Sequence, residues 1–331
     1  MSNNLENSIA ILGSGAWANT LAFLLGQNHY VVLWDHDAPR ARRRIKTRRF
    51  KKPITQKYPD NVKITSELTD VLNCQVIINA VSLKGMAEVF GKLCLLKPDE
   101  KIIFLNAAKG IDAENLKTPS EIIRTFCEKN PISVISGPNL AKELIKGKPM
   151  VTEIACEDKN VASFLQTELN NPSLRIYIND DTKGVELCGA LKNVMAIAAG
   201  ACDSLGLGES AKASLVTRGL NEIGQFLKFY GCKEQTLLGP AGVGDLVATC
   251  SSQLSRNYRV GYFLAEGKKL EDVQRRLGEV AEGVNTATAV SKIIEENNLN
   301  MPICQQVYRV INGEINAVDA VLNLMKRPVS K

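Results

Sequence analysis

The stretch Ile11–Ala22, ILGSGAWANTLA, places two glycines between an apolar strand and a segment with helical spacing. The pattern is that of a dinucleotide-binding loop, with Ala18 in place of the third glycine that often occurs there. In such a loop, Gly13 permits a tight turn and Gly15 lets the backbone approach a pyrophosphate. The helix that follows offers free N–H groups and a partial positive charge to that anion. A purely structural glycine turn has the same local sequence, so the rest of the chain has to decide.

The second apolar run, Tyr30–Asp35, ends on an acid that follows Gly15 by 20 residues. An acid at a distance of about 20 residues is typical of a ribose-binding residue, so the spacing favours a dinucleotide site. Asp35 favours NAD(H), because its carboxylate would repel the 2′-phosphate of NADP(H). The next segment, Arg40–Lys52, contains nine basic residues and no acid. It is typical of a phosphate-binding neighbour or of a solvated helix face, and less of a nucleic-acid patch, since Phe50 is its one aromatic residue.

The first half of the chain alternates between apolar, β-rich runs and helical segments. The strands expected there are Ser8–Leu12, Tyr30–Asp35, Gln75–Val81, Lys101–Leu105, Ile132–Ile135, Val151–Ala155 and Leu174–Ile178. Continuous apolar strands separated by helices indicate a parallel sheet that is covered on both faces. Residues 1–181 are therefore expected to form a Rossmann-like, doubly wound, mostly parallel sheet of the α/β class, and to bind the dinucleotide.

The second half is helical in its spacing, and strand-like runs nearly vanish after about residue 181. Helices are expected at Val185–Leu205, Ala211–Tyr230, Arg256–Glu266, Leu270–Leu277, Thr286–Asn297, Pro302–Asn312 and Ala317–Met325. The glycine-rich segment Gly239–Asp245 is the main irregular interruption, and it is expected to present Asp245 on a loop. Residues 182–331 are thus predicted to form an all-α domain that supplies the substrate and catalytic groups.

The composition bounds the function classes. The chain has 331 residues, 45% of them hydrophobic, and a net charge of +6, which suits two globular domains and an anionic ligand. Nine scattered cysteines without a CxxC pair indicate buried, reduced thiols, and the polar N-terminal segment is unlike a signal peptide, so a cytoplasmic protein is expected. No uninterrupted apolar run reaches about 18 residues, so no membrane span is expected. With two histidines, His29 and His36, a histidine-based zinc site is not expected either.

Three basic residues are candidates for chemistry. Lys109 follows a predicted strand, at the edge where ligands of an open parallel sheet bind; a plain surface lysine is the alternative. Lys192 interrupts an apolar helix, where desolvation would lower its pKa toward a range useful for proton transfer, unless its side chain extends to the domain boundary. Arg256, between Ser255 and Asn257, suits a phosphate or carboxylate, or is a surface arginine after an N-cap serine.

Several ordered motifs together are more specific than the glycine loop. They are GSGAWANTLA, NAAKGID, SGPNLAKE, LKNVMAIAAGACD, TRGLNEI, GPAGVGDLVATC, SRNYRVG, VAEGVNT and NMPI. In these motifs the chain resembles the bacterial NAD(P)-dependent glycerol-3-phosphate dehydrogenases along nearly its whole length. The resemblance implies the reversible reduction of dihydroxyacetone phosphate to sn-glycerol 3-phosphate by NAD(H) or NADP(H), without a metal. It further implies that the product feeds glycerophospholipid synthesis, and it is compatible with a homodimer.

The resemblance also implies residue roles. Lys192 would be the catalytic proton donor to the carbonyl oxygen. The substrate would be held by Lys109, Gly137, Asn139, Lys192, Asp245, Ser255, Arg256 and Asn257. The cofactor would be held by Gly13, Gly15, Ala16, Trp17, Asp35, His36, Lys109, Ala141, Arg256, Val280 and Glu282. The chain departs from the usual pattern at Asn139, where the family has Ser or Thr, and at Ala16, where a Ser is common.

Two other functions compete with this one. A related two-domain dehydrogenase of the β-hydroxyacid type could also use an active-site lysine, although it would not need Arg256 for a phosphate. A non-catalytic dinucleotide-sensing regulator would need the glycine loop, but not Lys192, Asp245 and Arg256 together. The expected partners are therefore a small phosphorylated substrate and a nicotinamide dinucleotide, and no nucleic acid.

Overall fold

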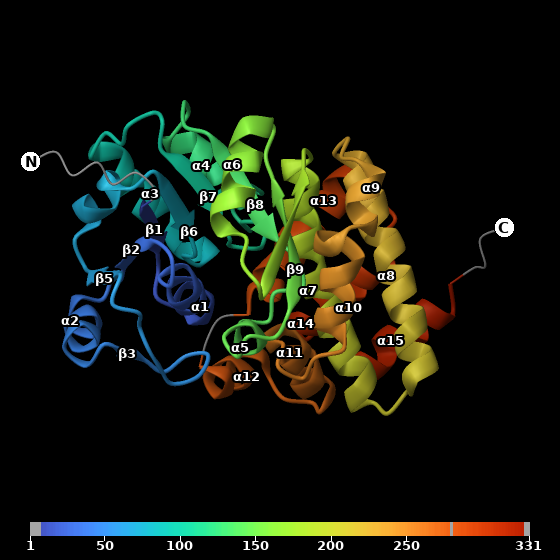
Figure 1. The fold of residues 1–331 in the computed structure, drawn as a ribbon. Helices are drawn as coiled ribbons and strands as arrows, with labels where there is room; N and C mark the ends of the chain where they lie inside the picture. The colour runs from blue at the N-terminus through green and yellow to red at the C-terminus, as the bar shows by residue number, and fades with distance from the viewer. Residues whose placement is uncertain (1–7, 279–280, 328–331) are drawn as a thin grey trace, which may run out of the picture. The chain divides into compact units, whose positions relative to one another are not determined.

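The computed structural model describes residues 8–278 and 281–327 and divides the chain into two compact units (Figure 1). The sheet unit consists of residues up to Ala108 together with Pro119–Thr182. The helical unit consists of Lys183 onward together with the segment Lys109–Thr118, which follows the sheet strand at residues 103–106 in the sequence. The chain therefore enters the helical unit briefly, returns to the sheet unit, and enters the helical unit again.

The sheet unit contains one sheet of eight strands in the order β10-β9-β8-β7-β6-β1-β2-β5. Its strands are β1 (Ser8–Leu12), β2 (Tyr30–Trp34), β5 (Val62–Thr65), β6 (Val76–Asn79), β7 (Ile103–Asn106), β8 (Ile132–Ser136), β9 (Met150–Ala155) and β10 (Leu174–Asn179). All neighbouring strands run parallel except β8 and β9, which are antiparallel. The predicted fold class is confirmed. The edge strand β5 was not predicted, because its four residues include a lysine and lie in a polar segment.

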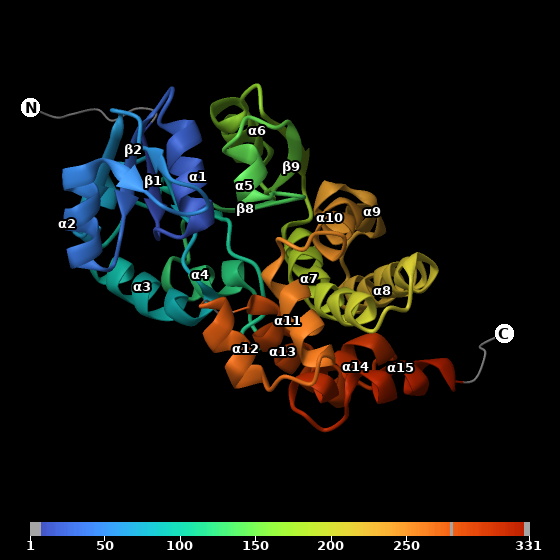
Figure 2. The ribbon, with the colours of Figure 1, turned by 90° about the horizontal axis from the view of Figure 1, so that it is seen from below.

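The remaining elements of the sheet unit are short strands and connecting helices. They are α1 (Ala16–Leu25), α2 (Ala38–Thr47), β3 (Arg49–Phe50), β4 (Gln56–Lys57), η1 (Leu68–Asn73), α3 (Leu83–Leu95), α4 (Pro119–Phe126), α5 (Ala141–Leu144) and α6 (Lys159–Leu169). Strands β3 and β4 form a separate antiparallel pair. Helices α3 and α4 lie side by side (Figure 2).

Alternate residues of the central strand explain why both faces of the sheet are covered. Ile9 and Ile11 of β1 belong to one apolar cluster with α1, whereas Ala10 and Leu12 belong to another with α3. Successive strand residues point to opposite faces, so a strand that is apolar at every position needs a layer on each side. Burying an Ile or Leu side chain completely stabilises the fold by about 1.5–3 kcal/mol.

The register of the parallel strands brings their carboxyl ends to one edge. Leu12 of β1 pairs with Trp34 of β2 and with Asn79 of β6, and Asn79 pairs in turn with Asn106 of β7. The residues that follow these strands, Gly13 and Asp35 among them, therefore emerge together. Ligands of an open parallel sheet bind outside this edge.

The helical unit is built around α7 (Thr182–Ser204), which is almost fully buried. The other elements are α8 (Glu209–Phe229), α9 (Glu234–Leu238), η2 (Pro240–Gly244), α10 (Asp245–Cys250), α11 (Arg256–Ala265), α12 (Leu270–Leu277), α13 (Glu282–Asn297), α14 (Pro302–Ile311) and α15 (Ala317–Met325). All the predicted helices are present. By length and composition α7 could span a membrane, but 89% of its apolar window is buried inside the structure, as in the core helix of a globular unit.

Two glycines allow α11 to cross α7 at close range. A Cβ atom added to Gly200 of α7 would lie 1.9 Å from the carbonyl oxygen of Tyr258, and one added to Gly261 of α11 would lie 1.8 Å from that of Ile197. Any larger residue would force the two backbones apart. This contact fixes the beginning of α11, and with it Arg256, relative to the helix that carries Lys192.

The prediction of a loop at Gly239–Asp245 is wrong. Pro240–Gly244 forms a π-helical turn, and Asp245 is the first residue of α10. The glycines serve close packing rather than an irregular path, since a Cβ atom at Gly242 would lie 2.1 Å from the carbonyl oxygen of Leu237. Helix α9, which contributes that carbonyl, was also missed, because five residues are too few to show helical periodicity.

Two further features of the fold are a buried glutamate and the cysteines. The carboxylate of Glu222 in α8 accepts hydrogen bonds from the backbone N–H groups of Ile303 (2.7 Å) and Cys304 (3.1 Å), and so caps the beginning of α14. All nine cysteines have free thiols, most of them buried, which confirms the expectation of buried thiols.

Candidate functional site

The helical unit gathers two lysines around one buried carboxylate. The Nζ atom of Lys192 lies 2.7 Å from Oδ1 of Asp245, and the Nζ atom of Lys109 lies 2.5 Å from Oδ2. Asp245 is 2% exposed and Lys192 is 8% exposed, whereas the side chain of Lys109 is 21% exposed. The segment Lys109–Thr118 thus places Lys109 in the same unit as its two partners, although α7 begins more than 70 residues later.

The pKa values of this cluster are shifted by burial and by mutual charge. Burial lowers the pKa of the Lys192 ammonium to about 8; Lys109 lowers it too, while Asp245 opposes the shift. Burial alone would raise the pKa of Asp245, but the two ammonium groups outweigh it and hold that pKa below its ordinary value. A lysine with a pKa near 8 exchanges its proton readily at neutral pH, as a general acid or base requires. The lowered pKa expected from the sequence is confirmed.

Thr249 is a member of the site that the sequence analysis missed. Its Oγ1 accepts a hydrogen bond from Nζ of Lys192 at 2.9 Å and lies 3.2 Å from Oδ1 of Asp245. Asp245 and Thr249 are one helical turn apart on α10, so both side chains point the same way. The signal was available in the i, i+4 spacing, but it required α10 to be recognised as a helix.

The beginning of α11 carries the three residues expected to bind the substrate. Ser255 is the N-cap and accepts from the N–H of Tyr258 at 3.3 Å; Arg256 is exposed; Asn257 is buried. Oδ1 of Asn257 accepts from the N–H of Gly283 at 3.0 Å and so holds the beginning of α13. An exposed arginine in the first turn of a helix combines a charged fork with the positive end of the helix dipole, a combination that suits an anion.

The residues expected near the cofactor in this unit lie around the start of α13. Glu282 is the first residue of that helix, while Val280 lies outside the described residues. The next residue, Gly283, packs so closely that a Cβ atom there would lie 2.8 Å from the backbone oxygen of Asn193. Because Asn193 follows Lys192, the starts of α11 and α13 are both anchored near the lysine.

In the sheet unit, the glycine loop has the backbone that its sequence predicts. Gly13 has φ +101°, and a Cβ atom there would lie 2.8 Å from the carbonyl oxygen of Ala80, so the turn requires glycine. Gly15 is the N-cap of α1, and a Cβ atom there would have no heavy atom of the described residues within 4 Å. The loop is therefore tight at Gly13 and open at Gly15, where the helix N–H groups of Ala16 and the half-buried Trp17 begin. Such an opening fits a pyrophosphate.

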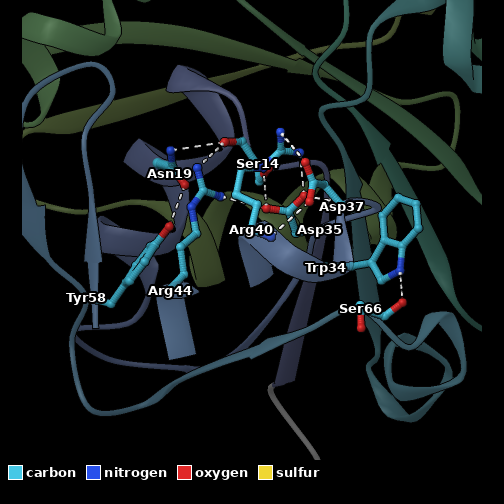
Figure 3. A network of polar contacts seen from close by, with 9 residues as sticks. All are labelled: Ser14, Asn19, Trp34, Asp35, Asp37, Arg40, Arg44, Tyr58 and Ser66. Atoms are coloured by element: carbon cyan, nitrogen blue, oxygen red, sulfur yellow. Dashed lines mark hydrogen bonds and ion pairs between the residues drawn. The ribbon is translucent and has the colours of Figure 1, made fainter. Parts of the chain in front are cut away.

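The carboxylate of Asp35 is already engaged in hydrogen bonds within the protein. It is fully buried, and its oxygens accept hydrogen bonds from Arg40 and Arg44 of α2 (Figure 3). Burial alone would raise its pKa, but the hydrogen bonds from Arg40 and Ser14 leave that pKa below its ordinary value. His36, the next residue, is exposed, and its ring centroid lies 6.3 Å from that of Trp34.

The segment after β8 supplies the last predicted residues. Gly137 is buried, and a Cβ atom there would lie 2.9 Å from Cα of Thr152, so the backbone is in close contact with β9. Nδ2 of Asn139 donates to Oγ1 of Thr152 at 2.9 Å, while its buried Oδ1 has no hydrogen-bond partner in the described part of the chain. Ala141 is the first residue of α5. Asn139 therefore has one amide atom engaged within the unit and one acceptor to offer.

Comparison with known proteins covers nearly the whole chain. Residues 8–162 match the family described as NAD-dependent glycerol-3-phosphate dehydrogenase N-terminus, and residues 181–322 match its C-terminus counterpart. The chain is 40% identical to the glycerol-3-phosphate dehydrogenase [NAD(P)+] of Synechocystis sp. over 96% of this chain and 93% of that protein. The corresponding enzyme of Trichormus variabilis is also 40% identical, over 98% of both chains.

A solved structure agrees with the sequence relatives. The crystal structure of glycerol-3-phosphate dehydrogenase from Coxiella burnetii superposes with a TM-score of 0.91 at 33% identity, covering 98% of this chain and 100% of that one. Sequence and fold thus point to the same proteins along the full length. The chain belongs to the NAD-dependent glycerol-3-phosphate dehydrogenase family.

Proposed function

We propose that Lys192 is the general acid and base of the reaction that this family catalyses. The chain is an NAD(P)-dependent oxidoreductase that interconverts dihydroxyacetone phosphate and sn-glycerol 3-phosphate. The observation that carries the proposal is the cluster of Lys192, Lys109 and Asp245, in which a buried ammonium has a pKa of about 8. The nicotinamide cofactor, when bound, supplies or accepts the hydride at C2 of the substrate.

The proton step follows from the charges in the cluster. During reduction, negative charge develops on the substrate's carbonyl oxygen, and the ammonium of Lys192 both stabilises that charge and donates a proton to it. In the reverse direction the neutral amine accepts the hydroxyl proton. Asp245 and Thr249 orient Nζ through their hydrogen bonds at 2.7 and 2.9 Å. Lys109, bonded to the other carboxylate oxygen, adds a second positive charge and orients the substrate.

The phosphate of the substrate is assigned to the beginning of α11. Arg256 is exposed in the first turn, where the helix dipole also favours an anion. Ser255 and Asn257 flank it, and both are engaged in holding the local backbone. Gly137 and the acceptor of Asn139 are proposed as further substrate contacts. Arg256→Ala should raise KM for dihydroxyacetone phosphate, and an unchanged KM would contradict the phosphate assignment.

The cofactor is assigned to the glycine loop of the sheet unit. The open space at Gly15 and the uncapped start of α1 fit the pyrophosphate. Ala16, Trp17, His36 and Ala141 are proposed as further contacts in this unit, and Lys109, Arg256, Val280 and Glu282 in the helical one. In this assignment residues 1–181, apart from Lys109–Thr118, form the dinucleotide-binding domain, and that segment together with residues 182–331 forms the substrate and catalytic domain. We further propose a cytoplasmic homodimer whose product feeds glycerophospholipid synthesis.

The first experiment is the absorbance of NADH or NADPH on addition of dihydroxyacetone phosphate. Turnover is expected; folded protein without turnover would contradict the proposal. Lys192→Ala should lower kcat by at least about 100-fold and leave the dinucleotide Kd nearly unchanged. Lys228→Ala is the matched control, since this exposed lysine lies in the last turn of α8. Loss of dinucleotide binding in Lys192→Ala would show instead that the lysine is structural.

A further inference from the structure

The carboxylate of Asp35 has its acceptor capacity filled within the protein. Oδ1 accepts from Nη2 of Arg40 at 2.5 Å and from the N–H of Asp37 at 3.1 Å. Oδ2 accepts from Nε of Arg40 at 2.8 Å and from Nη1 of Arg44 at 3.1 Å. A carboxylate offers about four lone-pair sites. These four donors, with the Ser14 hydroxyl beside them, fill those of Asp35. The side chain is also fully buried.

This arrangement conflicts with the usual role of an acid at the end of the second strand. Such an acid selects NAD(H) by accepting hydrogen bonds from the ribose hydroxyls and by repelling a 2′-phosphate. To do so, Asp35 would have to release charge-assisted bonds to two arginines, each stronger than a bond to a neutral hydroxyl. The two guanidinium groups also outweigh the single charge of Asp35, and with Asp37 beside Arg40 the four charges balance, so the repulsion expected from a lone carboxylate is absent.

Asp35 instead holds two arginines at the edge of the sheet. Arg40 donates to Asp35 through Nε and Nη2, and its side chain remains 30% exposed. Its Nη1 lies 3.5 Å from the carboxylate of Asp37. Arg44 is 11% exposed, and its Nη2 donates to the carbonyl oxygen of Ser14 at 3.1 Å. Arg44 therefore ties α2 to the glycine loop. Figure 3 shows Arg44 joining the backbone of Ser14 to Asp35, and Arg40 against the carboxylates of Asp35 and Asp37.

The same network continues away from the arginines and rigidifies the loop. Nδ2 of Asn19 donates to the carbonyl oxygen of Ser14 at 3.1 Å, and the hydroxyl of Tyr58 donates to Oδ1 of Asn19 at 2.6 Å. The carbonyl of Ser14 is thus fixed from two sides. The guanidinium of Arg40 is in turn held in one orientation by its two hydrogen bonds to Asp35. It therefore loses little entropy when it binds a phosphate, which favours binding.

We infer that Arg40, oriented by Asp35, recognises the 2′-phosphate of NADP(H), and that Asp35 does not select NAD(H). The inference rests on the proposed cofactor site at the glycine loop. The exposed part of the Arg40 guanidinium supplies the charge-assisted donors that a phosphate needs. Asp35 is a positioning residue in this scheme. Arg44 belongs to the support, because its side chain is nearly buried against the loop.

The test measures Kd for NADPH and for NADH by titration calorimetry, without substrate. NADPH should bind at least about 10-fold more tightly than NADH. Arg40→Gln should weaken NADPH binding by about 10-fold or more and change NADH binding by less than about 2-fold; Arg40→Lys should fall between, because it keeps the charge and loses the planar fork. Arg42→Gln is the matched control, since Arg42 is exposed and lies two positions along α2, facing away from Arg40.

The outcomes separate this inference from the site on which it rests. Equal Kd values for the two cofactors, or equal weakening of both by Arg40→Gln, would overturn the inference and leave the cofactor site in place. Failure of both cofactors to bind would overturn the two together. A preference for NADPH that Arg42→Gln removes as completely as Arg40→Gln would show that general positive charge, rather than Arg40, recognises the phosphate.

Discussion

The Nζ atom of Lys192 lies 2.7 Å from Oδ1 of Asp245, and both side chains are almost completely buried. The same carboxylate also binds the ammonium of Lys109 through its other oxygen. One negative charge therefore faces two positive ones, and the cluster retains a net positive charge when both lysines are protonated. A site of this kind favours a substrate atom on which negative charge develops.

The pH dependence of the reaction should report the pKa of Lys192. Reduction needs the protonated amine, so kcat/KM for dihydroxyacetone phosphate should fall as pH rises through about 8, the pKa that burial gives this lysine. Oxidation of sn-glycerol 3-phosphate needs the neutral amine, so it should rise over the same interval. Initial rates between pH 6.5 and 9.5 in both directions test this, and a reduction rate that is flat across that range would exclude Lys192 as the proton donor.

Thr249→Val should impair catalysis by removing one hydrogen bond to the ammonium. A bond to a charged group contributes about 1.5–3 kcal/mol, so a loss of about 10-fold or more in kcat is expected. The bond stabilises the charged form of Lys192, and without it the falling limb of the reduction profile should move to lower pH. Thr249→Ser keeps the hydroxyl and should restore both properties. A variant with lower kcat and an unmoved pH profile would indicate a packing role instead.

The two loop glycines should respond differently to alanine. Gly13→Ala should lower the melting temperature, because the residue has φ +101° and its Cβ would lie 2.8 Å from a backbone oxygen. Gly15→Ala has an ordinary backbone conformation and open space, so the protein should keep its stability. If the pyrophosphate occupies that space, Gly15→Ala should weaken dinucleotide binding by about 10-fold or more. Unchanged binding would place the pyrophosphate elsewhere.

Glu222 should make stability depend on pH. Burial raises its pKa to about 7, although the N–H groups of Ile303 and Cys304 oppose the shift. A raised pKa means that the folded state binds the proton more tightly than the unfolded chain. Its contribution is therefore complete below about pH 4.5 and is lost as pH rises through about 7. The melting temperature of Glu222→Gln, which cannot ionise, should fall less between pH 5 and 8 than that of the parent.

Glu234→Gln is the control for that comparison, because Glu234 is an exposed acid in the first turn of α9. Its melting temperature should follow the parent across the whole range. If Glu222→Gln and the parent differ by the same amount at pH 5 and at pH 8, the pH dependence has another source.

Local sequence predicted the parts of the fold that carry a strong pattern. The apolar runs predicted the seven main strands, because a strand buried on both faces is apolar at every position. The helical spacing of the second half predicted its long helices, because a helix buried along one side repeats its apolar residues every three to four positions. Strand β5 and helices α9 and α10 show no such sequence pattern. Each is too short for its period to be read, and each is held by contacts with distant residues.

The three charged residues of the candidate site were named from the sequence, but Thr249 and the pairings among the side chains were not. Lys192 was identified because a charge in an apolar helix needs a partner, and the partner is Asp245, 53 positions away. Nothing local indicates that pairing, nor that Asp35 would be enclosed by arginines from the following helix. The family relationship decides among the three functions considered, in favour of glycerol-3-phosphate dehydrogenase over the β-hydroxyacid enzyme and the regulator.

The detour of Lys109–Thr118 into the helical unit has a consequence for any attempt to divide the protein. Ile111 is buried in the core of the helical unit, and Nζ of Lys292 donates to the carbonyl oxygen of Ala113 at 2.6 Å. A cut at residue 182 would leave this segment on the wrong fragment and deprive Asp245 of Lys109. A chimaera between two relatives would therefore have to exchange two separate stretches of sequence, 109–118 and 183 onward, to keep the helical unit whole.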